Sequence, residues 1–188
     1  MSIAGDDLPV QVTHIPGITR VRYTNSTKQD VRLVTAGEDH LVRLLPSEPT
    51  ATDVIPLVME DATQNISWIE ANNKYLVTAS EDGAVRLYQH ALQSEDDPQK
   101  ATSCIRIVRR EVLPVRCVSL ERATESPRAA ICSDELIIRV ASVEDPRQIT
   151  LLTGHTRGVR AASWSPILPL LVSCGSDGDI RVWDMSSS

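Results

Sequence analysis

The sequence predicts an all-β fold assembled from about four similar repeats. Short runs in which apolar and polar side chains alternate are separated by turns rich in Asp, Glu and Gly, and one such pattern recurs along the chain. The pattern consists of an apolar run, an acidic turn and a strand that carries an arginine. It reads LVTAGEDHLVRLL at 33–45, LVTASEDGAVRLY at 76–88 and LVSCGSDGDIRVW at 171–183.

The spacing of the repeats favours a β-propeller. The strand arginines follow one another at intervals of 43, 53 and 42 residues: Arg43, Arg86, Arg139 and Arg181. Two of these intervals fall in the range of about 40 to 45 residues that is typical of propeller blades. The longer interval contains the polar acidic segment 93–102, which we expect to be an inserted loop. A repeat of this size cannot bury a core alone, so we expect the blades to stack on one another.

Each blade is expected to contain strands a to d in chain order. An N-terminal segment, 1–18, precedes blade one, 19–63, whose strands are expected at 19–24, 31–36, 41–45 and 53–58. Blade two, 64–111, is expected to use 65–69, 75–79, 84–89 and 104–108. Blade three, 112–153, is expected to use 115–120, 129–132, 136–142 and 148–152. Blade four, 154–188, is expected to use 159–164, 170–174 and 179–183 and to lack strand d.

The composition suits a β-rich core and gives no sign of a membrane span. The 188 residues are 41% hydrophobic and contain no Phe, so Val, Ile and Leu must form the core. No apolar run approaches the roughly 18 residues of a membrane span, and the start lacks the features of a secretory signal. We therefore expect a soluble intracellular protein. The four cysteines form no C-x-x-C pair, so we expect buried free thiols, with no metal and no cofactor.

The segment 154–184, GHTRGVRAASWSPILPLLVSCGSDGDIRVWD, resembles a complete WD repeat with its Gly-His opening and Trp-Asp close. The resemblance implies a structural tetrad of hydrogen-bonded side chains: His155, Ser173, Asp177 and Trp183. A buried imidazole and carboxylate each need partners, and a hydroxyl and an indole N–H supply them. The other repeats have incomplete tetrads; blade two, for example, keeps Thr78 and Asp82 but lacks the Gly-His pair.

Three degenerate repeats followed by LLTGHTRGVRAASWSP and SDGDIRVWDM resemble, more narrowly, the first part of the N-terminal propeller of the replisome and sister-chromatid-cohesion adaptor family, the family of the acidic nucleoplasmic DNA-binding protein. The resemblance implies an all-β WD-repeat propeller that forms an incomplete arc of a seven-bladed ring. It also implies a nuclear scaffold that binds replication factors or chromatin, with a general WD-repeat scaffold in another complex as the alternative. The alternative is a closed four-bladed ring in which 8–15 supplies the missing strand d. An open arc would leave the strand at 179–183 as an unpaired edge, and we would then expect self-association.

The residue types of a hydrolase triad occur in blade four, but their setting argues against catalysis. Ser173 is expected in the middle of a blade, with no strained strand-to-helix turn and no glycine-rich oxyanion loop. The glycine turns also do not fit the phosphate-binding fingerprints. We therefore expect no enzymatic activity.

Acidic turns between strands b and c predict a protein-binding surface. The acids Glu38, Glu81, Asp134 and Asp179 would form a negative crescent that attracts a basic segment of a partner. The alternative is that Asp and Gly simply suit turns.

Nucleic-acid binding is a second alternative, carried by the cluster Arg106, Arg109, Arg110 and Arg116. The net charge of −6 and the 3% aromatic content count against it. We expect Arg109 and Arg110 to lie in a solvated turn, where they remain candidates for partner binding. The strand c arginines are expected to be solvated.

Overall fold

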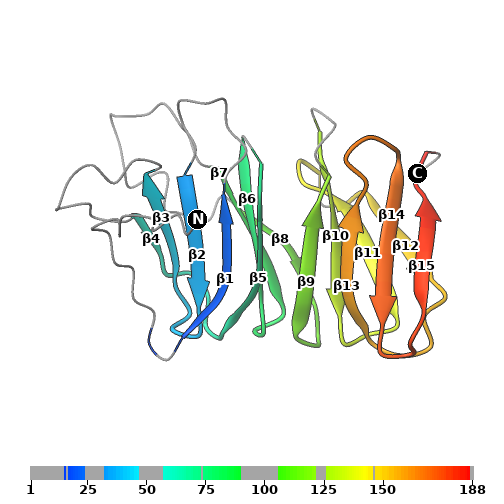
Figure 1. Ribbon diagram of the computed structural model, residues 1–188, viewed down its shortest axis with the longest axis horizontal. Coiled ribbons are helices and arrows are strands. Elements are labelled where there is room, and N and C mark those ends of the chain that lie inside the picture. Colours follow the sequence, from blue (N-terminus) through cyan, green and yellow to red (C-terminus); the bar gives the residue numbers. More distant parts are fainter. Residues whose placement is uncertain are drawn as a thin grey trace, which may run out of the picture.

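The computed structural model describes residues 15, 17–23, 32–46, 57–72, 74–89, 106–121, 126–145 and 147–186. These residues form four antiparallel sheets that stand side by side in a row (Figure 1). Each sheet is one blade, so the predicted all-β fold with four repeats is confirmed. No helix in the described ranges is long and apolar enough to cross a membrane.

Each blade is a meander in which every strand pairs with the next one in the chain. Blade one contains β1 (Ile18–Tyr23), β2 (Arg32–Gly37), β3 (Val42–Pro46) and β4 (Leu57–Met59). Blade two contains β5 (Ile66–Ala71), β6 (Tyr75–Ser80), β7 (Ala84–Gln89) and β8 (Arg106–Arg110). Blade three contains β9 (Val115–Leu120), β10 (Arg128–Ser133), β11 (Ile137–Ser142) and β12 (Ile149–Thr153). Blade four contains β13 (Val159–Trp164), β14 (Leu170–Gly175) and β15 (Ile180–Asp184).

The four blades form an open arc. Strand β1 contacts β5, β5 contacts β9, and β9 contacts β13, so the first strands lie in succession along the row. Blades one and four stand at opposite ends of that row (Figure 1). The described blades therefore do not close into a four-bladed ring. The candidate closing strand 8–15 lies outside the described residues except for the exposed Ile15.

Apolar packing between neighbouring blades forms the core. Each blade has a trailing face, made by alternate side chains of strands b and c, and a leading face that also includes strand a. Val77, Val85 and Leu87 of the trailing face of blade two pack against Val115 and Val118 of the leading face of blade three. Equivalent clusters join blade one to blade two and blade three to blade four. Because strand side chains alternate in direction, one short sheet supplies both faces.

Two expectations about strands and cysteines were wrong. Strand β8 extends to Arg110, so Arg109 and Arg110 lie in a strand, opposite Val85 and Ala84, and not in a solvated turn. The pairing of β8 with β7 continues to the end of β8, because the chain turns only after residue 110.

Only part of the cysteine prediction holds in the described chain. Cys117 and Cys132 are buried and face each other across β9 and β10. Cys174 is exposed, because it lies on the trailing face of blade four at the end of the arc. Cys104 lies outside the described residues.

Two glycines in the turns between strands b and c provide a matched pair of substitutions. Gly83 has φ of 80° and Gly178 has φ of 85°, which is the left-handed region. A Cβ on Gly83 would overlap the backbone oxygen of Glu111, whereas a Cβ on Gly178 would meet nothing within 4 Å. We expect Gly178→Ala to lower the free energy of unfolding by about 1 to 2 kcal/mol, the cost of the left-handed conformation alone. Gly83→Ala should lower the free energy of unfolding by more than Gly178→Ala does, because its Cβ also overlaps the Glu111 oxygen.

Urea unfolding of both variants measures this difference. Equal losses would mean that the Glu111 carbonyl moves aside without cost, and that the turn of blade two does not need its close contact with the next loop.

Candidate functional site

The turns between strands b and c and the loops that enter the next strand a lie together on one rim of the arc. Backbone hydrogen bonds hold them there: Glu81 N–H donates to Asn65 O over 3.0 Å, and Ser176 N–H donates to Gly158 O over 2.9 Å. Glu111 N–H likewise donates to Gly83 O over 2.7 Å. Turn and loop therefore form one connected surface in blades two to four, which we call the loop rim.

In blade four, a chain of hydrogen bonds joins the entering loop to strands b and c. Trp183 Nε1 lies 2.9 Å from Ser173 Oγ, which lies 2.9 Å from His155 Nε2. His155 Nδ1 lies 2.8 Å from Asp177 Oδ2. The indole can only donate and the carboxylate can only accept. The hydroxyl of Ser173 therefore donates to Nε2, and Nδ1–H donates to Asp177, so the chain of bonds has a single direction.

Asp177 is the acceptor at which this chain ends. Burial disfavours its ionised form, but hydrogen bonds from Thr156 N–H, His155 and Asp179 N–H outweigh this and lower the pKa of Asp177 to about 2. Asp177 is thus a carboxylate at neutral pH. It fixes both the tautomer of His155 and the position of the loop at 154–158.

The same three side chains have the bonding order of a hydrolase triad. Ser173, however, is buried, and its oxygen already accepts the indole N–H of Trp183. A nucleophile must be presented to substrate with an oxyanion site beside it. This arrangement connects strands inside a blade and leaves Ser173 Oγ covered.

Blades one to three hold the equivalent turn acid in another way. The acid pairs with the strand c arginine four residues later: Asp39 with Arg43 at 2.6 Å, Asp82 with Arg86 at 2.7 Å, and Glu135 with Arg139 at 2.6 Å. These arginines were expected to be solvated, and that expectation was wrong. In blade four the partner of the turn acid Asp177 is His155. Arg181 contacts Asp179 instead, at 2.9 Å.

The pair in blade two is the most buried of the three acid–arginine pairs. Arg86 and Asp82 have side chains that are each 5% exposed, and the contact is bidentate. Burial opposes ionisation of Asp82, but hydrogen bonds from Arg86, Thr63 N–H and Ala84 N–H lower the pKa of that carboxyl well below its usual range. Thr78, which occupies the position of Ser173, has a buried hydroxyl that makes no hydrogen bond within the described residues.

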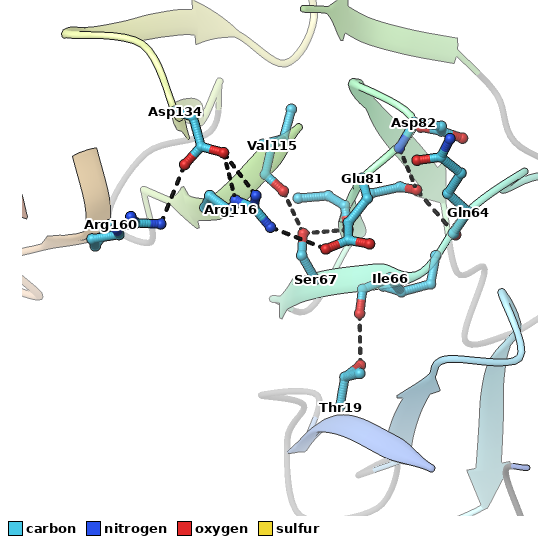
Figure 2. A network of polar contacts seen from close by, with 12 residues as sticks. Thr19, Gln64, Ile66, Ser67, Glu81, Asp82, Val115, Arg116, Asp134 and Arg160 are labelled. Carbon is cyan, nitrogen blue, oxygen red and sulfur yellow. Dashed lines mark hydrogen bonds and ion pairs between the residues drawn. The ribbon is translucent and has the colours of Figure 1, made fainter. Parts of the chain in front are cut away.

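A second set of polar contacts runs from blade to blade along the first strands (Figure 2). Thr19 Oγ1 donates to Ile66 O over 2.6 Å, and Ser67 Oγ donates to Val115 O over 2.5 Å. The equivalent position in blade three is Arg116. The hydroxyls of Thr19 and Ser67 thus join blade one to blade two and blade two to blade three, because each donates to a backbone oxygen of the next blade.

From Arg116 onward the contacts are ionic. Arg116 contacts Glu81 at 3.0 Å and Asp134 at 2.7 Å, and Asp134 contacts Arg160 at 3.2 Å (Figure 2). The hydrogen bond from Arg116 lowers the pKa of Asp134 and raises that of Arg116. We call Glu81, Arg116, Asp134 and Arg160 the charge ladder. It links the rims of blades two, three and four.

The ladder changes the interpretation of the predicted acidic crescent. Glu81 and Asp134 were proposed as acids that face a partner, and Asp179 likewise, but each contacts an arginine. Glu38 is exposed. Sequence reasoning missed the exposed loop acids Glu60 and Asp61, although their position in a predicted loop was a usable signal.

Of the four arginines of the nucleic-acid alternative, the structure describes the side chain of Arg116 alone. Arg116 belongs to the charge ladder. Arg106, Arg109 and Arg110 lie on β8, but their side chains fall outside the described residues.

The charge ladder itself had a signal in the sequence. Strands β9 and β13 both begin with Val-Arg, which places Arg116 and Arg160 at the same position of their blades.

Comparisons with known proteins support the repeats. Residues 61–89 and 146–184 match the profile of the family described as "WD domain, G-beta repeat". Human Striatin-4 is 32% identical over 124 residues, which cover 60% of this chain and 16% of that protein. WD repeat and HMG-box DNA-binding protein 1 from Xenopus laevis is 28% identical over 154 residues, which cover 82% of this chain and 12% of that protein. The chain thus spans less than a fifth of the length of these relatives.

The fold also has a counterpart among solved structures. The crystal structure of the computationally designed Ika4 protein matches with a TM-score of 0.71 and 15% identity, over 97% of this chain and 99% of that one. At this identity the likeness concerns the fold alone. The chain thus has a fold of β-propeller blades, and residues 61–89 and 146–184 of it match WD repeats.

Removing the central hydroxyl of the blade four chain should destabilise the protein. Ser173→Ala leaves the Trp183 N–H and one ring nitrogen of His155 without their partner in a buried site. We expect the free energy of unfolding to fall by about 1 to 3 kcal/mol, measured by urea denaturation. Ser163→Ala, an exposed serine on the neighbouring strand β13, is the matched control and should change little. Equal effects would show that the hydrogen-bonded chain does not stabilise the blade.

Asp177 should make stability depend on pH in acid. Its pKa of about 2 in the folded protein is below the ordinary value of 3.8 for an aspartate, so its contribution to stability is complete above about pH 4 and is lost as pH falls toward 2. The difference in unfolding free energy between wild type and Asp177→Asn should therefore be constant near neutral pH and shrink through this window. A difference that does not change with pH would contradict the assignment of Asp177 as the ionised acceptor.

Proposed function

We propose that this chain is a non-catalytic protein-interaction scaffold that binds a partner on its loop rim. The observation that carries the proposal is the charge ladder, which fixes the rims of three successive blades relative to one another. Loops that are held before binding lose little entropy when a partner docks. Rigid strands beneath exposed loops are a common basis for recognition surfaces.

The two ends of the loop rim differ in their exposed charged side chains, and acids without arginines stand out at one end. Glu38, Glu60 and Asp61 are exposed at the blade one and two end. Arg157 is exposed at the blade four end, and the side chain of Arg160 is 57% exposed. A partner segment with a basic and an acidic end would be oriented along the arc by this field.

An open hollow lies beside the arginine end. It measures about 440 Å³ and is lined by Leu136, Ile137 and Thr153 together with Glu135, Gly154 and His155. Leu136 is among the large apolar side chains exposed to solvent. A partner residue with an apolar side chain fits this hollow, and the surrounding charges would then set its orientation.

The setting that we propose is nuclear, as an adaptor in DNA replication or chromatin. Two observations support it: the order of one sharp repeat after three degenerate ones, and the match over 82% of this chain to WD repeat and HMG-box DNA-binding protein 1. The match to Striatin-4 supports the scaffold role equally and favours no compartment. The partner that we propose is a basic segment of a replication or chromatin protein.

Charge reversal at the acidic end tests the scaffold proposal. The triple variant Glu38→Lys, Glu60→Lys and Asp61→Lys should weaken binding of a fluorescent Lys-rich peptide at least tenfold and remove its salt dependence, measured by fluorescence anisotropy. The variant Arg157→Glu, at the other end of the rim and outside the charge ladder, is the control and should bind the peptide as well as wild type or better.

Binding of duplex DNA is the outcome that would contradict the scaffold proposal. If Arg109→Glu with Arg110→Glu abolishes a gel shift with duplex DNA while the acidic triple variant binds the peptide normally, the protein-scaffold proposal fails and the nucleic-acid alternative is correct.

A further inference from the structure

The loop rim of blade three carries apolar side chains that the neighbouring blades lack. Val112 and Leu113, in the loop that enters β9, are 94% and 40% exposed, and Leu136, in the turn between β10 and β11, is 49% exposed. We call these three residues the apolar tip. Counted from the first paired residues of strands a and b, the equivalent positions are polar or glycine in the blades on either side: Thr63, Gln64 and Gly83 in blade two, and Thr156, Arg157 and Gly178 in blade four.

The fold of a blade does not account for the apolar tip. Single exposed apolar side chains are normal on protein surfaces, but here they replace polar residues or glycine in both segments of one rim. An apolar side chain that stays in water adds no hydrophobic stabilisation to the folded chain. Blades two and four flank the apolar tip on both sides, and neither covers it. A surface that becomes covered when a partner binds explains these residues better.

Ion pairs hold the two segments of the apolar tip side by side. Arg139 Nη1 lies 3.1 Å from Glu111 Oε2 and 2.6 Å from Glu135 Oε2, so one nitrogen contacts a carboxylate from each segment. Val112 directly follows Glu111, and Leu136 directly follows Glu135. The two apolar residues are therefore fixed on the same rim before a partner arrives, which lowers the entropic cost of binding.

The hollow beside Leu136 limits what the partner can insert. It measures about 440 Å³ and lies between Glu135, Leu136 and Ile137 of blade three and residues 153–155 at the entrance to blade four. Ligand pockets span about 300 to 1,000 Å³, so this hollow suits a single large side chain and is too small for a helix or a folded domain. The side chain of Glu135 is 23% exposed, so a carboxylate stands at the edge of the hollow.

We propose that blade three recognises one apolar side chain of a partner segment that has a lysine or arginine next to it. This inference rests on the scaffold function proposed above and names the feature of the partner that blade three selects. The apolar side chain enters the hollow against Leu136 and Ile137, and the flanking cation lies near Glu135. Val112 and Leu113 contact the same segment outside the hollow. Charge attracts the segment to the rim, and the apolar anchor decides which segment stays bound.

Two fluorescent peptides of equal length and charge test the proposal on the 188-residue chain. Both are rich in lysine, and one has a central leucine between two lysines where the other has serine. We expect wild type to bind the leucine peptide at least fivefold more tightly in fluorescence anisotropy, because only leucine fills the hollow. The double variant Val112→Ser with Leu136→Ser should bind both peptides with equal affinity. Both side chains are exposed, so the blades should remain folded, which circular dichroism checks.

Ile167→Ser is the matched control. Ile167 is 83% exposed and lies between β13 and β14, on the rim opposite the loop rim, so this variant should keep the preference for leucine.

The outcomes separate this inference from the scaffold proposal. Equal binding of the two peptides to wild type would overturn the inference and leave the scaffold proposal standing, because charge alone would then account for binding. If neither peptide binds wild type, both proposals fail. A preference for leucine that persists in the double variant would place the leucine outside blade three, and would also overturn the inference.

Discussion

A carboxylate held in the turn between strands b and c is the constraint on which each blade depends. The turn acids Asp39, Asp82, Glu135 and Asp177 occupy the same place in the repeat, and each needs a positive or hydrogen-bonding partner. Blades one to three supply an arginine four residues later, and blade four supplies His155. Because the partner lies on strand c or in the entering loop, meeting this requirement also fixes the turn at the end of the blade. The loop rim is therefore a consequence of providing partners for one turn carboxylate in each blade.

The fold could be predicted because its signals are local. Strand alternation, acidic turns and a period near 43 residues identified the blades, and the WD residues of blade four identified the side chains that the structure brings together around His155. The partners of the charged side chains could not be predicted, because they depend on residues that are close together only in the folded structure. Glu81 and Arg116 are 35 residues apart in the chain, and only the stacking of two blades brings them together. Arg86 alternates with apolar residues exactly as a solvated strand residue would, and its burial depends on the turn acid.

Hydroxyl and ionic contacts both join neighbouring blades, and the junction between blades two and three has one of each kind. Thr19 and Ser67 bind backbone oxygens of the next blade, which fixes distance without adding charge. Arg116 and Arg160 bind turn acids, which fixes the relative positions of exposed rims. The apolar faces would stack in either case, so the charge ladder contributes mainly to the shape of the surface offered to a partner, and salt is expected to act on that surface before it acts on the core.

The turn acid has its side-chain partner on strand c in blades one to three and in the entering loop in blade four. The entering loops are therefore under different sequence constraints. In blade four the loop must contain a histidine at position 155, so that loop cannot change freely. In blade two the acid takes its cation from strand c, and Thr63 donates to it through both its backbone N–H and its hydroxyl. The backbone part of this contact does not require a particular side chain in the loop. When the side-chain partner of the turn acid lies on the strand and not in the loop, the loop is therefore freer to diversify. The degenerate blades are the ones in which recognition residues can be exchanged by mutation without unfolding the repeat that carries them.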